Sequence, residues 1–170
     1  PGSCTMYGTA NTMCAIAESL GMSLPGSATI PAIAKEREEC AYKSGEAVVS
    51  LVKNNVKARD IINEKSIHNA MCYLLATGGS TNGILHLQAI HHEAGLGNLE
   101  LAKFDALSHK IPLLASIYPA SEYDMIDYYE AGGVKAVEYE LRKVLNLDAI
   151  TCVQKTKGEV LDASSKTSNE

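Results

Sequence analysis

The residues best suited to chemistry lie at the amino-terminal end of the chain, where one cysteine precedes a predicted helix. Cys4 sits in a Gly- and Ser-rich loop, and Thr9 and Asn11 are suitable N-cap residues for the helix that follows. Apolar residues then recur at helical spacing: Met13, Ile16, Ala17 and Leu20. A thiol near free backbone N–H groups and a helix dipole favours the thiolate, the form that binds metal or attacks an electrophile. The alternative is a small buried hydrophobe.

The segment around Cys4 resembles the cysteine segment of the dihydroxy-acid and sugar-acid dehydratases. Residues 4–13 read CTMYGTANTM, and residues 17–27 read AESLGMSLPGS. A second block at 76–87, ATGGSTNGILHL, is similar to the Gly-Gly-Ser-Thr-Asn segment of that family, and DYYEAGG at 127–133 matches less specifically. Because two long motifs occur in the right order over most of the chain, it is identified as a member of this family.

The resemblance implies a hydro-lyase that removes water from a 2,3-dihydroxy acid to give a 2-keto acid. Cys4 would be one of three thiolates holding an iron–sulfur cluster (2Fe-2S or 4Fe-4S), and Mg²⁺ would hold the small-molecule hydroxy-acid substrate. Hydrogen-bonding roles around the cluster are expected for three residues of the cysteine segment, Thr9, Asn11 and Thr12. Three residues of the second block are expected near the substrate pocket: Ser80, Thr81 and Asn82.

The same resemblance implies that residues 1–170 are a single domain or a fragment of the N-terminal domain of a longer enzyme. In the family, the other two cluster cysteines and the acidic magnesium ligands lie upstream of the segment matched here, and the proposed serine base lies in a separate carboxy-terminal domain. We therefore expect the isolated chain to be inactive. Two alternatives stay open: a scaffold or interaction module without chemistry, and Cys4 as a covalent nucleophile, for which the sequence singles out no base.

The motif around Cys4 combines features of two substrate groups. Thr5, Met6 and Gly8 are like the sugar-acid enzymes, whereas Tyr7 and Asn11 are like the branched-chain dihydroxy-acid enzymes. Branched-chain amino-acid biosynthesis is the first choice, and an aldonate or 6-phosphogluconate dehydratase is the alternative.

Composition sets outer bounds on the protein. Its 170 residues are 46% apolar with no tract long enough to cross a bilayer, and a net charge of −5 argues against nucleic-acid binding. The five cysteines include no Cys-x-x-Cys pair, so we expect a reducing cytoplasm and no disulfide framework. Three of them, Cys14, Cys40 and Cys72, fall in helical patterns and are expected in the core. The family resemblance implies a homo-oligomer.

The fold class expected is α/β, mainly helical with a small parallel sheet, as part of a larger N-terminal dehydratase domain. Strands are predicted at 111–117 and 149–153, with helices between them forming a crossover. A long helix is predicted from Pro31 to about Asn55, and one face of it carries a stripe expected to be buried: Ala41, Gly45, Val48, Val49 and Val52. Gly45 would allow close packing against a neighbour.

Two helices are predicted to meet at a tight corner. The first runs from about Glu64 to Thr77, and Gly78-Gly79 ends it because glycine readily takes the left-handed conformation. Ser80 or Thr81 can cap the second, which continues to about Ala94. The corner presents hydroxyls and free N–H groups suited to an anion. An ordinary helical hairpin with capped ends explains the same residues without a ligand.

Overall fold

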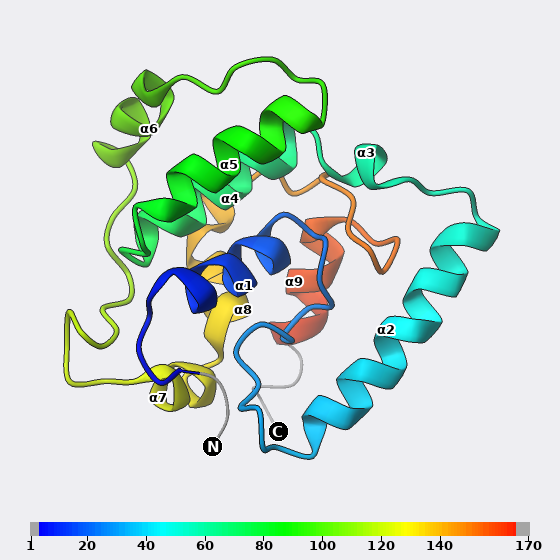
Figure 1. Ribbon diagram of the computed structural model, residues 1–170, viewed down its shortest axis with the longest axis horizontal. Coiled ribbons are helices and arrows are strands. Elements are labelled where there is room, and N and C mark those ends of the chain that lie inside the picture. The colour runs from blue at the N-terminus through cyan, green and yellow to red at the C-terminus, as the bar shows by residue number, and fades with distance from the viewer. Residues whose placement is uncertain (1–3, 166–170) are drawn as a thin grey trace.

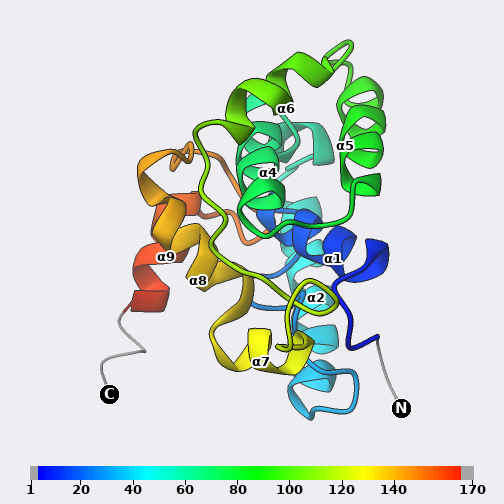
Figure 2. The same ribbon diagram turned by 90° about the vertical axis from the view of Figure 1, so that its left-hand side faces the viewer.

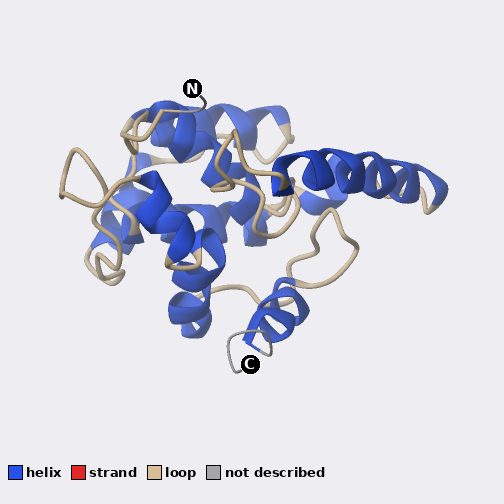
Figure 3. Ribbon diagram, turned by 90° about the horizontal axis from the view of Figure 1, so that it is seen from below, coloured by secondary structure: helices blue, strands red, loops and turns tan. Residues whose placement is uncertain are grey.

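The computed structural model describes residues 4–165, and every regular element in that range is a helix (Figures 1 and 3). The helices are α1 (Thr9–Ser19), α2 (Glu36–Lys53), α3 (Ala58–Ile61), α4 (Glu64–Ala76), α5 (Asn82–Glu93), α6 (Leu101–Ser108), α7 (Met125–Glu130), α8 (Gly133–Glu140), the 3₁₀ helix η1 (Leu141–Lys143) and α9 (Lys157–Ser165). Among the helices of residues 4–165, none is long and apolar enough to cross a membrane.

The predicted parallel sheet is wrong, since residues 4–165 contain no strand. Residues 111–117 are extended, but their amides bond a helix end: the N–H groups of Leu114 and Ala115 both donate to the carbonyl of Ala76, at 2.7 and 3.2 Å. Pro112 has no N–H to contribute to a ladder. Only the two ends of this segment, Ile111 and Ile117, are buried.

The second predicted strand, at 149–153, pairs with the residues that follow it. The N–H of Thr151 donates to the carbonyl of Lys155 at 2.9 Å, and Ile150 and Thr156 form an isolated antiparallel bridge. A turn this tight brings the chain back on itself at once. The apolar run is therefore a small hairpin-like turn, and no partner from 111–117 is needed.

Helix α4 lies at the centre of the molecule and contacts α1, α5, α6 and α8 (Figure 2). The sequence predicts one apolar face on this helix with Ile67, Ala70, Met71, Leu74 and Leu75; the first four are buried and Leu75 is half-buried. Successive residues of α4 face two different core clusters: Tyr73 packs in one with Tyr128 and Val134, and Leu74 packs in the other with α5 and α6 residues. Helices α1 and α4 therefore contribute side chains to both clusters and lie between them.

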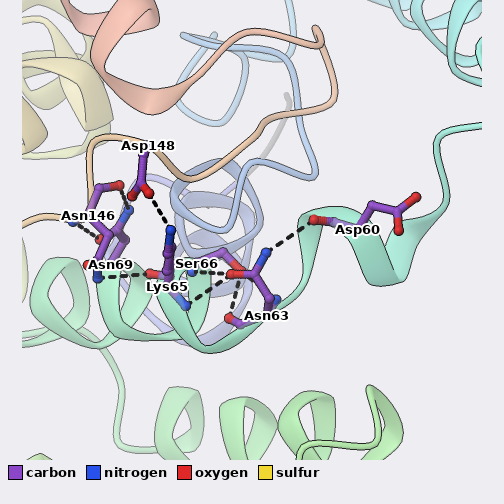
Figure 4. A network of polar contacts seen from close by, with 7 residues as sticks. All are labelled: Asp60, Asn63, Lys65, Ser66, Asn69, Asn146 and Asp148. Atoms are coloured by element: carbon purple, nitrogen blue, oxygen red, sulfur yellow. Dashed lines mark hydrogen bonds and ion pairs between the residues drawn. The ribbon is translucent and has the colours of Figure 1, made fainter.

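A polar network fixes the amino-terminal half of α4 (Figure 4). The Asn63 side chain caps the helix by accepting from the N–H groups of Lys65 and Ser66, at 3.0 and 3.3 Å. Asn69 is fully buried; its amide donates to the carbonyl of Asn146 at 3.1 Å, and its oxygen accepts from the Asn146 N–H at 2.7 Å. Lys65 also pairs with Asp148. The register of α4 against the 144–148 segment is therefore fixed, and with it the position of its carboxyl end.

Helix α2 departs from the prediction in one respect. It forms within the expected range, but none of its residues is buried, and the stripe expected to pack in the core is exposed. The helix lies at one edge of the molecule, beyond the loop that follows α1 (Figures 1 and 3). Within residues 4–165, a Cβ added at Gly45 would meet no atom within 4 Å, so the predicted close packing is absent there too.

Candidate functional site

The Cys4 loop is fixed by a side chain from the helix that follows it. The amide nitrogen of Asn11 donates to the carbonyls of Cys4 and Met6, at 2.7 and 2.8 Å, and Asn11 itself is buried. The N-cap of α1 is Gly8, without a side-chain cap, so the predicted capping by Thr9 or Asn11 is wrong. Asn11 instead closes the loop back onto α1 and leaves the Cys4 side chain exposed.

The rest of the loop lies on the segment that leads into α7. The N–H of Tyr7 donates to the carbonyl of Tyr118 at 2.7 Å, and the N–H of Met125 donates to the carbonyl of Thr5 at 3.0 Å. Two backbone hydrogen bonds from a distant part of the chain therefore hold the residues on either side of Met6. The cysteine is presented outward from a loop whose path is specified.

Beneath the loop, three tyrosines form a buried hydroxyl cluster. The Tyr7 hydroxyl lies 3.1 Å from the Thr77 hydroxyl and 3.4 Å from that of Tyr73, which lies 2.7 Å from the Tyr128 hydroxyl. Burial raises the pKa of all three phenols, so they stay neutral near neutral pH. We infer that they support the loop by packing and hydrogen bonding and supply no base. Sequence reasoning missed this cluster, although Tyr7 and Tyr128 both lie in the quoted motif segments.

The predicted corner between α4 and α5 meets the cysteine segment directly. The hydroxyls of Thr9 and Ser80 lie 3.1 Å apart, and the Asn82 amide donates to the Thr9 hydroxyl at 2.9 Å. The N–H of Ser80 donates to the hydroxyl of Thr12, which is fully buried, at 3.1 Å. Thr81 takes the N-cap position of α5 without a side-chain cap and is exposed. Thr9, Thr12, Ser80 and Asn82 thus make hydrogen bonds between the two segments, and Asn11 makes hydrogen bonds within the cysteine segment. Thr81 makes neither kind.

The contact between the two segments depends on a glycine. A Cβ added at Gly79 would lie 2.8 Å from Cδ1 of Leu74 and 2.9 Å from Cγ2 of Thr12. Such distances are too short for carbon atoms, so a side chain at this position would push α1 away from the corner. The Gly-Gly-Ser-Thr-Asn block therefore allows close packing against α1 and also supplies the polar groups that bond to it.

Cys4 contributes a single sulfur atom to this site. Within residues 4–165, no three His, Cys, Asp or Glu side chains are grouped so as to hold a metal. Cys72 and Cys152 are buried, and burial raises the pKa of Cys72 to about 11 and that of Cys152 above its usual value. Cys14 was expected in the core but is exposed, and Cys40 is half-buried. An exposed cysteine on a fixed loop fits the role of one metal ligand, and the remaining ligands of such a group would have to come from outside residues 4–165.

Comparison with known proteins identifies the family. Residues 1–160 match the model of the dihydroxy-acid/6-phosphogluconate dehydratase N-terminal domain. The chain belongs to this dehydratase family. It is 47% identical over 160 residues to the dihydroxy-acid dehydratase of Clostridium botulinum, a match that covers 93% of the chain and 29% of that relative. It is also 47% identical over 161 residues to the dihydroxy-acid dehydratase of Methanosarcina barkeri, covering 95% of the chain and 29% of the relative.

Another relative in the dehydratase family is dihydroxy-acid dehydratase 2 of Corynebacterium efficiens, 44% identical over 162 residues. The match covers 94% of this chain and 28% of that protein. The chain therefore spans under a third of the length of the relatives it matches. The helical fold of this chain corresponds to a part of the N-terminal domain of the proteins in this family.

A buried charge cluster in this dehydratase domain was also missed from the sequence. The Lys157 ammonium lies 2.8 and 2.9 Å from the two oxygens of Glu138, and both side chains are almost fully buried. Nearby, the Glu18 carboxylate accepts from the N–H groups of Gly26 and Ala28, at 2.6 and 2.8 Å. These three side chains join α1, α8 and α9, and Glu18 holds the loop that follows α1. The sequence gives no indication that these charged residues are buried, because charged residues on a helix usually face solvent.

Proposed function

We propose that this chain is part of a hydro-lyase that converts a 2,3-dihydroxy acid to a 2-keto acid. The observation that carries the proposal is the direct hydrogen bonding of the cysteine segment to the Gly78–Asn82 corner through Thr9, Thr12 and Ser80. Two segments far apart in the sequence are thereby joined, and one of them carries the exposed cysteine. The relatives named dihydroxy-acid dehydratase support the same reaction.

In this proposal Cys4 is one ligand of an iron–sulfur cluster, and the remaining ligands and a bound Mg²⁺ come from parts of the enzyme outside this chain. When bound, such a cluster supplies a Lewis acid for the departing 3-hydroxyl. Asn11 orients Cys4 by holding its carbonyl and that of Met6. Its removal should weaken cluster retention by about 10–100-fold, as is typical when a supporting hydrogen bond to a metal ligand is lost.

The chain's own polar residues would bind and orient the substrate. The Thr9 and Ser80 hydroxyls and the Asn82 amide are neutral donors that suit a carboxylate or hydroxyl group. Thr81, exposed and without a cap bond, is the hydroxyl of the corner best able to turn toward a ligand. The neutral tyrosines below supply no base, so the proton at C2 would be taken by a group outside this chain. We therefore expect the isolated 170-residue chain to show no turnover.

Metal analysis of the whole enzyme tests the cluster. Iron and sulfide would be measured in anaerobically prepared protein with wild-type sequence, with Cys4→Ser and with Cys14→Ser. Cys14 is a matched control because it is also exposed and belongs to the same segment of the chain. We expect Cys4→Ser to lose the cluster and its visible absorbance, and Cys14→Ser to keep both. A wild-type protein without iron, or a Cys4→Ser variant with wild-type iron content, would refute the proposal.

The substrate is proposed to be a branched-chain 2,3-dihydroxy acid, as expected for an enzyme of branched-chain amino-acid biosynthesis. The three relatives above are named dihydroxy-acid dehydratases, and Tyr7 and Asn11 are the motif residues that resemble the branched-chain enzymes. The family model also includes 6-phosphogluconate enzymes. Keto-acid formation by the whole enzyme from a branched-chain dihydroxy acid, an aldonate and 6-phosphogluconate would be compared. A higher kcat/KM for either sugar acid would overturn the substrate assignment and leave the reaction class intact.

A further inference from the structure

A turn at residues 24–28, in the loop between α1 and α2, is attached to α1 by one buried carboxylate. The two oxygens of Glu18 accept from the N–H groups of Gly26 and Ala28, at 2.6 and 2.8 Å, and Glu18 is 4% exposed. Gly26 has a φ of +83°, a left-handed conformation that favours glycine. Two hydrogen bonds to a single side chain therefore hold this turn against α1.

The Glu18 carboxylate has no cation of its own. Lys157 of α9 is buried nearby, but two of its N–H groups serve the oxygens of Glu138 of α8, at 2.8 and 2.9 Å. The Lys157 nitrogen also lies 3.5 Å from the backbone carbonyl oxygen of Glu18. Because an ammonium has three N–H donors, none remains for the Glu18 side chain. Two buried carboxylates thus share one cation, and that cation is bonded to Glu138.

The other ionisable groups packed around Glu18 do not supply the missing positive charge. Burial raises the pKa of the Tyr128 phenol on α7 and of the Cys152 thiol, so both are neutral near pH 7. The Lys135 side chain of α8 lies against Gly26, with Nζ 3.3 Å from the position that a Cβ would take there. Among residues 4–165, neither Lys135 nor any other basic side chain forms an ion pair with Glu18.

Glu18 is therefore the group in this cluster whose charge changes near neutral pH. Burial raises the pKa of Glu18 to about 7, against the opposing effect of the bonds from Ala28 and Gly26, and the charge of Glu138 adds to the rise. Burial also raises the pKa of Glu138, but the Lys157 ammonium on both of its oxygens opposes that rise. Opening of the loop would bring Glu18 into water, where its ordinary pKa is 4.5. The closed loop thus holds a proton that the open loop releases, so rising pH favours opening.

We propose that Glu18 is a pH-sensitive switch that releases the loop between α1 and α2 as the pH rises from 5 to 8. Helix α2, at the edge of the molecule (Figure 1), depends on this loop, because the Arg37 guanidinium donates to the carbonyl of Ser27 at 3.2 Å and also to that of Ile30. No residue of α2 is buried, and the far end of the helix is held by the Gln154 side chain. Release of the loop therefore frees one of the two ends of α2.

Hydrogen exchange in the whole enzyme, resolved to single amides by mass spectrometry, measures the opening directly. Division by the intrinsic exchange rate at each pH gives the opening equilibrium at the Gly26 and Ala28 amides. With a pKa of about 7 in the closed loop and 4.5 in the open one, this equilibrium should be about 70-fold larger at pH 8 than at pH 5. The Thr156 amide is an internal control: it donates at 2.8 Å to Glu159, an exposed carboxylate whose pKa is lowered, and its opening should change far less.

A matched pair of variants assigns the effect to Glu18. Glu18→Gln removes the titrating group at nearly constant size and should abolish the pH dependence at Gly26 and Ala28, whereas Glu159→Gln should keep the whole change. Should Glu18→Gln lose its helical circular dichroism, Glu138→Gln decides. Lys157 can then compensate the Glu18 charge, so the rise should shrink to about 10-fold or less, and an unchanged rise would refute the proposal.

Two further outcomes would overturn the switch. One is an opening equilibrium at Gly26 and Ala28 that is the same at pH 5 and pH 8, or a wild-type rise in Glu18→Gln. The other is equal opening at Gly26 and at Ala70, a fully buried residue of α4, because the loop would then open only when the whole domain unfolds. We expect Ala70 to open far less at both pH values. None of these residues belongs to the site at Cys4, so the test does not depend on the proposed chemistry.

Discussion

Replacing Lys157 with methionine should destabilise the fold far more than the same change at an exposed lysine. Lys157 and Glu138 are 3% and 2% exposed, and two hydrogen bonds of 2.8 and 2.9 Å join them. Removing one partner of such a pair leaves the other charge buried and uncompensated, which costs about 3–5 kcal/mol. The matching change at Lys65, whose pair with Asp148 is more than half exposed, should cost about 0–1 kcal/mol.

Urea denaturation of the chain, followed by circular dichroism, would compare Lys157→Met, Glu138→Leu, the double variant and Lys65→Met. Because the double variant buries no unpaired charge, it should recover most of the lost stability, so that the cycle gives a coupling energy of about 3 kcal/mol. Two results would refute the reasoning: Lys157→Met costing no more than Lys65→Met, or a double variant whose loss equals the sum of the single losses.

Three further changes test the supports of the site. Asn11→Asp replaces the donor to two carbonyls with a carboxylate, which should cost about 2–3 kcal/mol and speed hydrogen exchange at the Tyr7 amide. Gly79→Ala should cost about 1–3 kcal/mol in urea denaturation, because its methyl group overlaps Thr12. Burial raises the pKa of Glu18 to about 7, so the fold favours its protonated form. Relative to Glu18→Gln, wild-type stability should fall by about 2.5 kcal/mol as pH rises from 5 to 8.

Each of these tests has a contrary outcome. Unchanged exchange at Tyr7 in Asn11→Asp would show that the loop is held by its other contacts. Wild-type stability in Gly79→Ala would show that α1 and the corner can move apart freely. A Glu18→Gln variant with the same pH dependence as wild type would show that Glu18 is not the group that titrates.

The local features of this protein follow from its sequence. The residues at 4–13 and 76–87 identify the family, and the glycines at 78 and 79 predict where α4 ends. The apolar repeat of α4 predicts one buried face. The structure buries Asn69, Cys72 and Tyr73 as well, because this helix contacts neighbours on two sides. Helix spacing is a short-range property, so the sequence predicts it. The caps depend on the fold as well, since Asn11 donates to the Cys4 loop and does not cap α1.

Contacts between distant segments were decided by the tertiary structure. The apolar repeat of α2 correctly predicts a helix with one apolar face, but periodicity does not say what covers that face, and in this chain it points outward. The run at 149–153 has strand composition, but composition does not say which segment pairs with it. In the structure, it pairs with the residues that follow it directly. Likewise, nothing in the sequence distinguishes Glu138 and Lys157 from other charged residues. In the fold they are buried as an ion pair, so each side chain needs the other to compensate its charge.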